Sequence, residues 1–159
     1  MIHLVLYQPE IPDNTGALGR LSLGTGARLH LIRPLGFSLD DKQLKRAGLD
    51  YWHEVDLRVW ENWEEFLRQS GAVEEALFLL STKGGNTYWE RQFTAEEVWL
   101  VFGPETRGLP EPLLKRHAER VLRIPMAGTR SLNLATAAAI VLYEAVRQRQ
   151  TAGVGTPLA

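Results

Sequence analysis

The segment Phe102–Pro110, FGPETRGLP, combines residue types that could build a ligand site. It follows an apolar run, and a glycine at the end of a strand lets the backbone approach a ligand or turn sharply. Glu105 and Arg107 are close enough in sequence to orient each other or to occupy opposite walls of a site. The alternative is a tight loop that only leads into the helix expected after Pro110.

A second segment, PEIPDNTGALGR, places two glycines inside an expected helix. Gly16 and Gly19 each cost about 1 kcal/mol relative to alanine at a helical position. Such a cost is typical of close backbone approach, and the helix amides of residues 14–16 could hold an anion such as phosphate, with Arg20 reaching the same space. Alternatively, the glycines pack against a neighbouring strand and Arg20 is a surface cation.

A third segment, RIPMAGTRSLNLATAAAIVLYEA, runs from a strand end into a long helix for which Ser131 is the expected N-cap. The helix is apolar nearly all round, which predicts that it is buried. At 100° per residue one narrow sector holds four side chains, Asn133, Thr136, Ile140 and Tyr143. We expect this strip to face a polar site or a partner subunit. Alternatively, Asn133 and Tyr143 are core residues with satisfied hydrogen bonds.

Strands alternate with helices along the chain, which predicts one α/β domain over residues 1–150 with a mostly parallel sheet and helices on both faces. The expected strands are 2–7, 28–34, 76–82, 98–103 and 120–126. The expected helices are 14–27 with Asn14 as N-cap, 39–48, 60–71, 111–118 and 131–150. A polar tail, 151–159, is expected to be frayed. Ligands of such sheets bind at the carboxyl ends of the strands, where all three segments lie.

Composition excludes several classes of protein. The chain has 159 residues, of which 45% are apolar, and a formal charge of −1, so contacts with nucleic acid must come from local basic patches. It has no cysteine, which excludes disulfides, thiolate catalysis and cysteine metal sites, and its four histidines lack metal-type spacing. We expect a cytoplasmic protein without a membrane segment or metal, because no apolar stretch reaches about 18 residues and no signal peptide is apparent. Standard nucleotide-binding motifs are also missing from the sequence.

Taken together, the three segments resemble the three signature motifs of the SPOUT superfamily of knotted RNA methyltransferases. NTGALGR resembles the first motif, N-x-G-N-x-x-R, VFGPETRGLP the second and IPMAGTRSLNLATAAAIVLYEA the third. The stretches LVLYQPEIPDNTG, DDKQLKRAGLDYW and STKG further resemble the family of tRNA wobble-position ribose 2′-O-methyltransferases. The resemblance covers residues 2–147.

This resemblance implies S-adenosyl-L-methionine as the methyl donor, the 2′-hydroxyl of tRNA nucleotide 34 (cytidine or modified uridine) in the anticodon stem-loop as the acceptor, a deep C-terminal trefoil knot and a homodimer. The implied donor-binding residues are Leu80, Gly103, Ile124, Met126, Ser131 and Leu132. The implied catalytic residues are Arg20, Ser131, Asn133 and Tyr143. The implied RNA-binding residues are Asn14, Arg20, Lys42 and Arg46. A bulky residue at Gly103 is expected to block the donor, and Glu105 is expected to be structural or to shape the donor site.

One residue departs from the resemblance, because Ala17 stands where the first motif has its second asparagine. If that asparagine binds RNA or supports the motif arginine, substrate choice or affinity could differ here. Two alternatives therefore stay open: a ribose methyltransferase acting on another RNA such as ribosomal RNA, and an inactive RNA-binding factor. The presence of Arg20, Ser131 and Asn133 argues against the second.

Overall fold

A seven-stranded sheet forms the centre of the protein, in the order β3-β2-β1-β6-β4-β7-β5. Every strand pair in it is parallel, so the predicted α/β fold with a mostly parallel sheet is confirmed. The computed structural model describes residues 1–159, with the side chain of Leu49 excepted. The strands are β1 (Ile2–Tyr7), β2 (Arg28–Ile32), β3 (Leu57–Trp60), β4 (Leu77–Leu80), β5 (Asn86–Thr87), β6 (Val98–Phe102) and β7 (Val121–Arg123).

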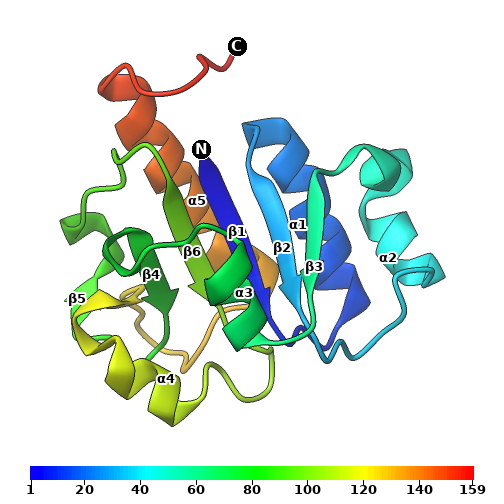
Figure 1. The fold of residues 1–159 in the computed structure, drawn as a ribbon, viewed down its shortest axis with the longest axis horizontal. Coiled ribbons are helices and arrows are strands. Elements are labelled where there is room, and N and C mark those ends of the chain that lie inside the picture. The colour runs from blue at the N-terminus through cyan, green and yellow to red at the C-terminus, as the bar shows by residue number, and fades with distance from the viewer.

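Helices cover both faces of this sheet, as predicted. The α-helices are α1 (Pro12–Thr25), α2 (Lys42–Ala47), α3 (Trp63–Gln69), α4 (Glu111–Arg116) and α5 (Leu134–Thr151). In Figure 1, α1 and α5 lie behind the sheet and α3 and α4 lie in front, while α2 flanks α1 at the right. Short 3-10 helices span Leu49–Glu54, Glu74–Ala76, Tyr88–Glu90 and Ala118–Arg120. None of the helices in the described part of the chain is long and apolar enough to cross a membrane.

The two faces of the sheet carry separate hydrophobic cores because successive strand residues point to opposite sides. Leu4 and Leu6 of β1 are buried in the core that α1 and α5 complete. Val5 between them belongs to the other core, which includes Phe66 of α3 and Leu114 of α4. Since β1 is buried on both faces, it reads in sequence as a continuous apolar run rather than an alternating one.

The start of α1 differs from the prediction. The helix begins at Pro12, and Asn14 lies inside its first turn instead of capping it. Proline suits the first helical position because its missing N–H would have no intrahelical partner there. The N-cap residue, Ile11, forms no side-chain capping hydrogen bond. The side chain that usually accepts a hydrogen bond from the first turn is therefore missing at this helix start.

The start of α5 also differs from the prediction, because its N-cap is Asn133 rather than Ser131. The Asn133 Oδ1 atom accepts a hydrogen bond from the backbone N–H of Thr136 at 3.2 Å. At its other end α5 reaches Thr151, the first residue of the predicted tail. The tail then returns to the helix, where the Gln150 Nε2 atom donates to the carbonyl of Thr156 at 3.0 Å.

Two strands were not predicted from the sequence, β3 and β5. Both are edge strands in the sheet order. Strand β3 is only partly buried, so its sequence, LRVW, lacks the apolar run of a central strand. Strand β5 has two residues, too few for any periodicity to be read.

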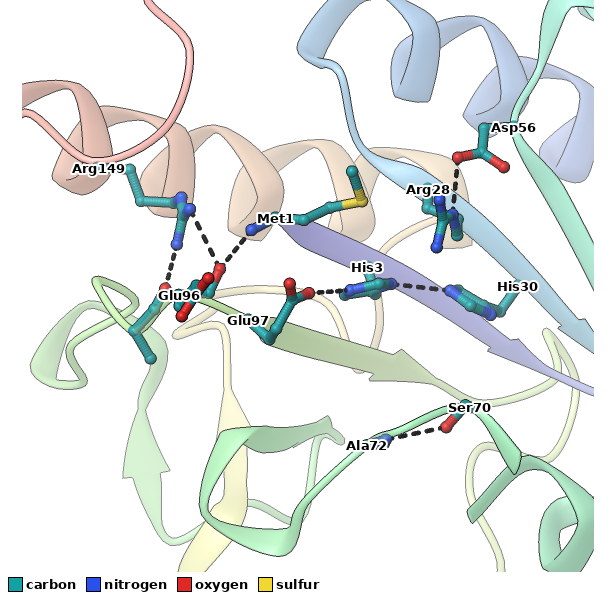
Figure 2. A network of polar contacts seen from close by, with 11 residues as sticks. Met1, His3, Arg28, His30, Asp56, Ser70, Ala72, Glu96, Glu97 and Arg149 are labelled. Carbon is teal, nitrogen blue, oxygen red and sulfur yellow. Dashed lines mark hydrogen bonds and ion pairs between the residues drawn. The ribbon is translucent and has the colours of Figure 1, made fainter. Parts of the chain in front are cut away.

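A buried polar network occupies the amino-terminal end of the sheet, opposite the end where the three segments lie (Figure 2). The Nδ1 atom of His3 lies 2.9 Å from the Nε2 atom of His30. The Nε2 atom of His3 lies 2.5 Å from the Glu97 carboxylate. The Trp60 Nε1 atom donates to His30 Nδ1 at 3.0 Å. Because an indole only donates, His30 must be neutral and carry its proton on Nε2. Burial, together with His3, Arg28 and Arg58, lowers the pKa of His30 to about 3.

Candidate active site

A cavity of about 350 Å³ opens at the carboxyl ends of β4, β6 and β7. This volume lies in the range of small-molecule sites, about 300–1,000 Å³. Its walls come from three loops that follow those strands, 81–83, 103–109 and 124–132, and from the first turns of α5. The position agrees with the rule that ligands of parallel sheets bind at the strand carboxyl ends. Much of the wall is backbone and apolar side chain.

The residues expected to bind the methyl donor are brought together at this cavity. They all line it: Leu80, Gly103, Ile124, Met126, Ser131 and Leu132. They come from positions up to 52 residues apart in the sequence, and adjacent parallel strands deliver them to one place. Whether they bind the donor stays a prediction, but the geometry required for it is present.

Gly103 has a role in the loop itself that the sequence did not reveal. A Cβ atom at this position would lie 2.3 Å from the backbone nitrogen of Leu109 and 2.4 Å from the carbonyl carbon of Gly108. Any side chain would therefore collide with the chain before reaching a ligand. This corrects the expectation that a bulky residue at position 103 would block the donor directly. Such a residue would first displace the loop that forms the cavity wall.

A chain of hydrogen bonds, centred on the cavity-lining residue Glu105, joins the three predicted motifs. The Glu105 carboxylate accepts from the backbone N–H groups of Glu10 at 2.8 Å and Ile11 at 2.7 Å. It also accepts from the Asn14 Nδ2 atom at 3.3 Å. The Asn133 Nδ2 atom in turn donates to Asn14 Oδ1 at 3.0 Å. Glu105 thus binds the two backbone N–H groups that immediately precede α1, and its predicted structural role agrees with these contacts.

These contacts change the interpretation of two predicted site residues. Asn14 is 7% exposed, and both ends of its side-chain amide are used within the protein. A positioning role fits it better than the predicted contact with RNA. Asn133 caps α5 and donates to Asn14. A positioning role therefore also fits Asn133 better than the predicted catalytic role. Only Ser131, among the four predicted catalytic residues, lines the cavity.

Arg20 and Tyr143 lie away from the cavity. Arg20 is exposed on α1, eight residues after its start, which is about 12 Å along the helix axis. Tyr143 is 50% exposed on α5, ten residues after Asn133 and so about 15 Å along the axis. The alternative that Tyr143 is a core residue is therefore wrong, and the face of α5 that carries Thr136 and Tyr143 is exposed in the single chain.

The first two of the three glycines of α1, Gly16 and Gly19, serve helix packing. A Cβ atom on Gly16 would lie 2.3 Å from the carbonyl oxygen of Leu44 in α2, and one on Gly19 would lie 2.6 Å from the Trp52 ring. The alternative of close packing is correct, although the neighbour is α2 and the following 3-10 helix rather than a strand. The anion at this helix start is the Glu105 carboxylate.

The predicted RNA-binding residues Lys42 and Arg46 are exposed on α2, which this packing holds beside α1. A shallow hollow lies next to them, lined by Lys45, Arg46, Asp50, Trp52 and His53. The helix itself is capped by the Asp41 side chain, which accepts from the backbone N–H of Gln43 at 2.7 Å.

Sequence reasoning missed several polar residues at the cavity. These are Ser81, Thr82, Lys83 and Thr106. The first three follow β4, so the rule of strand carboxyl ends would have found them had it been applied to that strand as well. No group of three or more acidic, histidine or cysteine side chains in the described part of the chain is arranged to hold a metal ion.

Comparison with known proteins agrees with the three motifs. The sequence model of the SpoU rRNA Methylase family matches residues 1–143. The chain belongs to this family. One relative is a protein of Methylovorus glucosotrophus named tRNA (cytidine(34)-2'-O)-methyltransferase. Its sequence is 51% identical to this chain, and the match covers 96% of this chain and 99% of the relative. The resemblance stated from the motifs is thereby confirmed.

Solved structures give the same result. One, described as giving structural insights into the 2-OH methylation of C/U34 on tRNA, has a TM-score of 0.88 and 50% identity, and the match covers 95% of this chain and 97% of the other. An AdoMet-bound rRNA methyltransferase from Sinorhizobium meliloti has a TM-score of 0.81 and 30% identity, and the match covers 92% of this chain but 56% of the other. Of these two structures, only the first matches this chain over nearly the full length of both proteins.

Proposed function

We propose that this SpoU family member transfers a methyl group from S-adenosyl-L-methionine to the ribose 2′-hydroxyl of nucleotide 34 in tRNA. The observation that carries the proposal is that all six residues expected to bind the donor line one cavity at the strand carboxyl ends. The names of near-full-length relatives support the choice of tRNA nucleotide 34. The cytoplasm is the compartment we propose for this activity.

The cavity fits a donor of this kind. Its glycine-containing loops expose backbone N–H and carbonyl groups, which can bind an adenine edge and ribose hydroxyls without charged side chains. Leu80, Ile124 and Met126 provide apolar contact for a ring. This apolar part of the wall favours a neutral heterocycle, whereas the charged side chains of Lys83, Arg107 and Arg130 lie at the exposed rim.

The chain's own residues would then do limited chemistry. When bound, S-adenosyl-L-methionine supplies an activated methyl group. The protein has to align the acceptor hydroxyl with it and help remove the hydroxyl proton. Ser131 lines the cavity wall, which supports the role we propose for it in orienting the ribose. A guanidinium group is a poor base, so Arg20 would hold an RNA phosphate or stabilise negative charge on the attacking oxygen rather than take up the proton.

We further infer a homodimer, because Arg20 lies outside the cavity of its own chain. The exposed face of α5 presents Thr136, Tyr143 and half-buried Ile140, and α1 lies beside α5. Pairing of these faces would cover the exposed aromatic ring and could bring Arg20 of one chain to the cavity of another. A trefoil knot in the C-terminal part also belongs to this proposal, since the loops that would form it are those that line the cavity.

The experiment is methyl transfer from labelled S-adenosyl-L-methionine to total tRNA, followed by mapping of the modified nucleotide. We expect a 2′-O-methyl group at nucleotide 34. Arg20→Ala should abolish transfer and leave donor binding intact by calorimetry, whereas Arg68→Ala, which removes an exposed arginine on α3, should change neither. Transfer to ribosomal RNA but not to tRNA would refute the assigned acceptor, and donor binding without any transfer would favour an inactive RNA-binding factor.

A further inference from the structure

The mouth of the cavity carries three cationic side chains whose surroundings differ. Lys83, Arg107 and Arg130 all line it. The Lys83 Nζ atom lies 3.2 Å from the Glu111 carboxylate, so its charge is partly balanced. No carboxylate within the described residues forms an ion pair with Arg107, although Glu10 lies near it. Arg107 is exposed and keeps most of its five N–H donors free.

Arg107 is held by a residue in an unusual backbone conformation. Its Nη2 atom donates a long hydrogen bond of 3.3 Å to the Gln8 Oε1 atom. Gln8 has φ = 48°, the left-handed region that favours glycine. The hydrogen bond from its backbone N–H to the Ile32 carbonyl, 2.9 Å long, keeps it there at the end of β1. Non-glycine residues held in this region cluster at ligand sites, where the surrounding structure offsets the strain.

The backbone next to Arg107 is fixed independently. The Glu10 Oε1 atom accepts from the Thr106 N–H at 2.9 Å and from the Thr106 hydroxyl at 2.7 Å. The hydrogen bond from the Thr106 backbone is the largest cause that lowers the pKa of Glu10, so the carboxylate is ionised at neutral pH. On the other side of the loop, Glu105 accepts from the Glu10 N–H. The loops after β1 and β6 are therefore joined twice, directly beside Arg107.

We propose that Arg107 binds a phosphate of the acceptor RNA at the mouth of the cavity, and that Gln8 is the positioning residue that aims its guanidinium. This inference rests on the proposed function. The planar guanidinium matches the geometry of two phosphate oxygens, and Gln8 occupies one side of it only. The exposed position at the mouth fits a large polyanion that covers the cavity better than a group buried inside it.

The test compares Arg107→Ala, Arg107→Lys and Gln8→Gly with the wild-type enzyme in methyl transfer to tRNA. For Arg107→Ala we expect the KM for tRNA to rise about tenfold, with donor affinity unchanged by calorimetry. The dependence of log KM on log salt concentration should become shallower by about one unit, as for the loss of one phosphate contact. Arg107→Lys should recover only part of the affinity because lysine cannot form two parallel hydrogen bonds.

Gln8→Gly isolates the positioning role, since glycine adopts the same backbone conformation without strain and removes only the acceptor. We expect an increase of about threefold in the KM for tRNA, with kcat and thermal stability unchanged. Arg68→Ala on α3 is the control for the loss of one exposed positive charge. Equal behaviour of Arg107→Ala and Arg68→Ala would overturn the inference, and weaker donor binding in Arg107→Ala would instead assign Arg107 to a carboxylate of the donor. Failure of the wild-type enzyme to methylate tRNA would refute the proposed function itself, which is a separate result.

Discussion

The replacement Gly16→Ala tests whether close packing of α1 against α2 explains the first glycine of the motif. The added methyl group would lie 2.3 Å from the Leu44 carbonyl oxygen and 2.7 Å from the Ala47 Cβ atom. One of these neighbours is backbone and the other is a short side chain, so neither can rotate away. The two helices would have to separate, and α2 carries the exposed Lys42 and Arg46 that we expect to contact RNA.

Two opposing effects determine the size of the change. Alanine is favoured over glycine inside a helix by about 1 kcal/mol. Overpacking of a tight contact costs about 1–3 kcal/mol and occasionally more, and contact with a backbone atom places Gly16 at or above the upper end. We therefore expect a net loss of about 2 kcal/mol in the free energy of unfolding. For a chain of this length that corresponds to a fall in Tm of about 4–8 °C.

Gly24 of the same helix is a matched control. It is exposed, and a Cβ atom there would meet nothing within 4 Å, so Gly24→Ala should stabilise the protein by up to about 1 kcal/mol. Both variants are measured by urea unfolding at one protein concentration, because association would make the stability depend on concentration. If Gly16→Ala is as stable as Gly24→Ala but no longer binds tRNA, the glycine serves a ligand and the packing argument is refuted.

Three further predictions concern the polar contacts and the departure from the first motif. Glu105→Gln places an amide nitrogen against backbone N–H donors at the start of α1, so we expect a loss of about 1–2 kcal/mol and weaker donor binding, measured by thermal unfolding and calorimetry. His30 binds its proton at about pH 3 when folded and near pH 6.5 when unfolded, so the unfolded state binds more protons between these values. The free energy of unfolding should therefore fall by about 1.4 kcal/mol per pH unit as pH drops below 6.5. In urea titrations, His30→Gln should make this dependence on pH shallower. An unchanged slope in the variant would assign the pH dependence to other groups. Ala17→Asn restores the motif residue and should change only the KM for tRNA, and altered donor affinity would contradict this.

The central strands and the position of the cavity could be predicted from the sequence because they depend on strong local patterns. Strand β1 was placed at its observed bounds, since its apolar run is bordered by prolines. The three segments with unusual chemistry all follow strands of a parallel sheet, and such strands share one carboxyl edge. The individual residues, such as Leu80 and Leu132, were assigned to one site by the family resemblance, and both line the cavity.

The starts of α1 and α5 were predicted incorrectly, because the side chains of Asn14 and Asn133 form contacts with distant segments that local rules do not include. Asn14 and Ser131 have the residue types that cap helices, and local preference favoured both. In the structure the Asn14 side chain instead donates to Glu105, which is 91 residues away and also accepts from the two backbone N–H groups just before α1. The same side chain accepts from Asn133, and that contact agrees with Asn133 as the cap of α5. Local rules fail here because three distant segments share one hydrogen-bonded chain.

This shared chain also explains why the departure at position 17 leaves the site intact. The contacts that join the three motifs pass through Asn14, Glu105 and Asn133, and all three are present. Ala17 lies one turn after Asn14 on α1, half-buried and outside the cavity-lining set of the described residues. Its effect is therefore confined to the surface of α1 that also carries Arg20. Because neither Ala17 nor Arg20 lines the chain's own cavity, we expect residue 17 to affect how RNA or a second chain is held rather than the donor site.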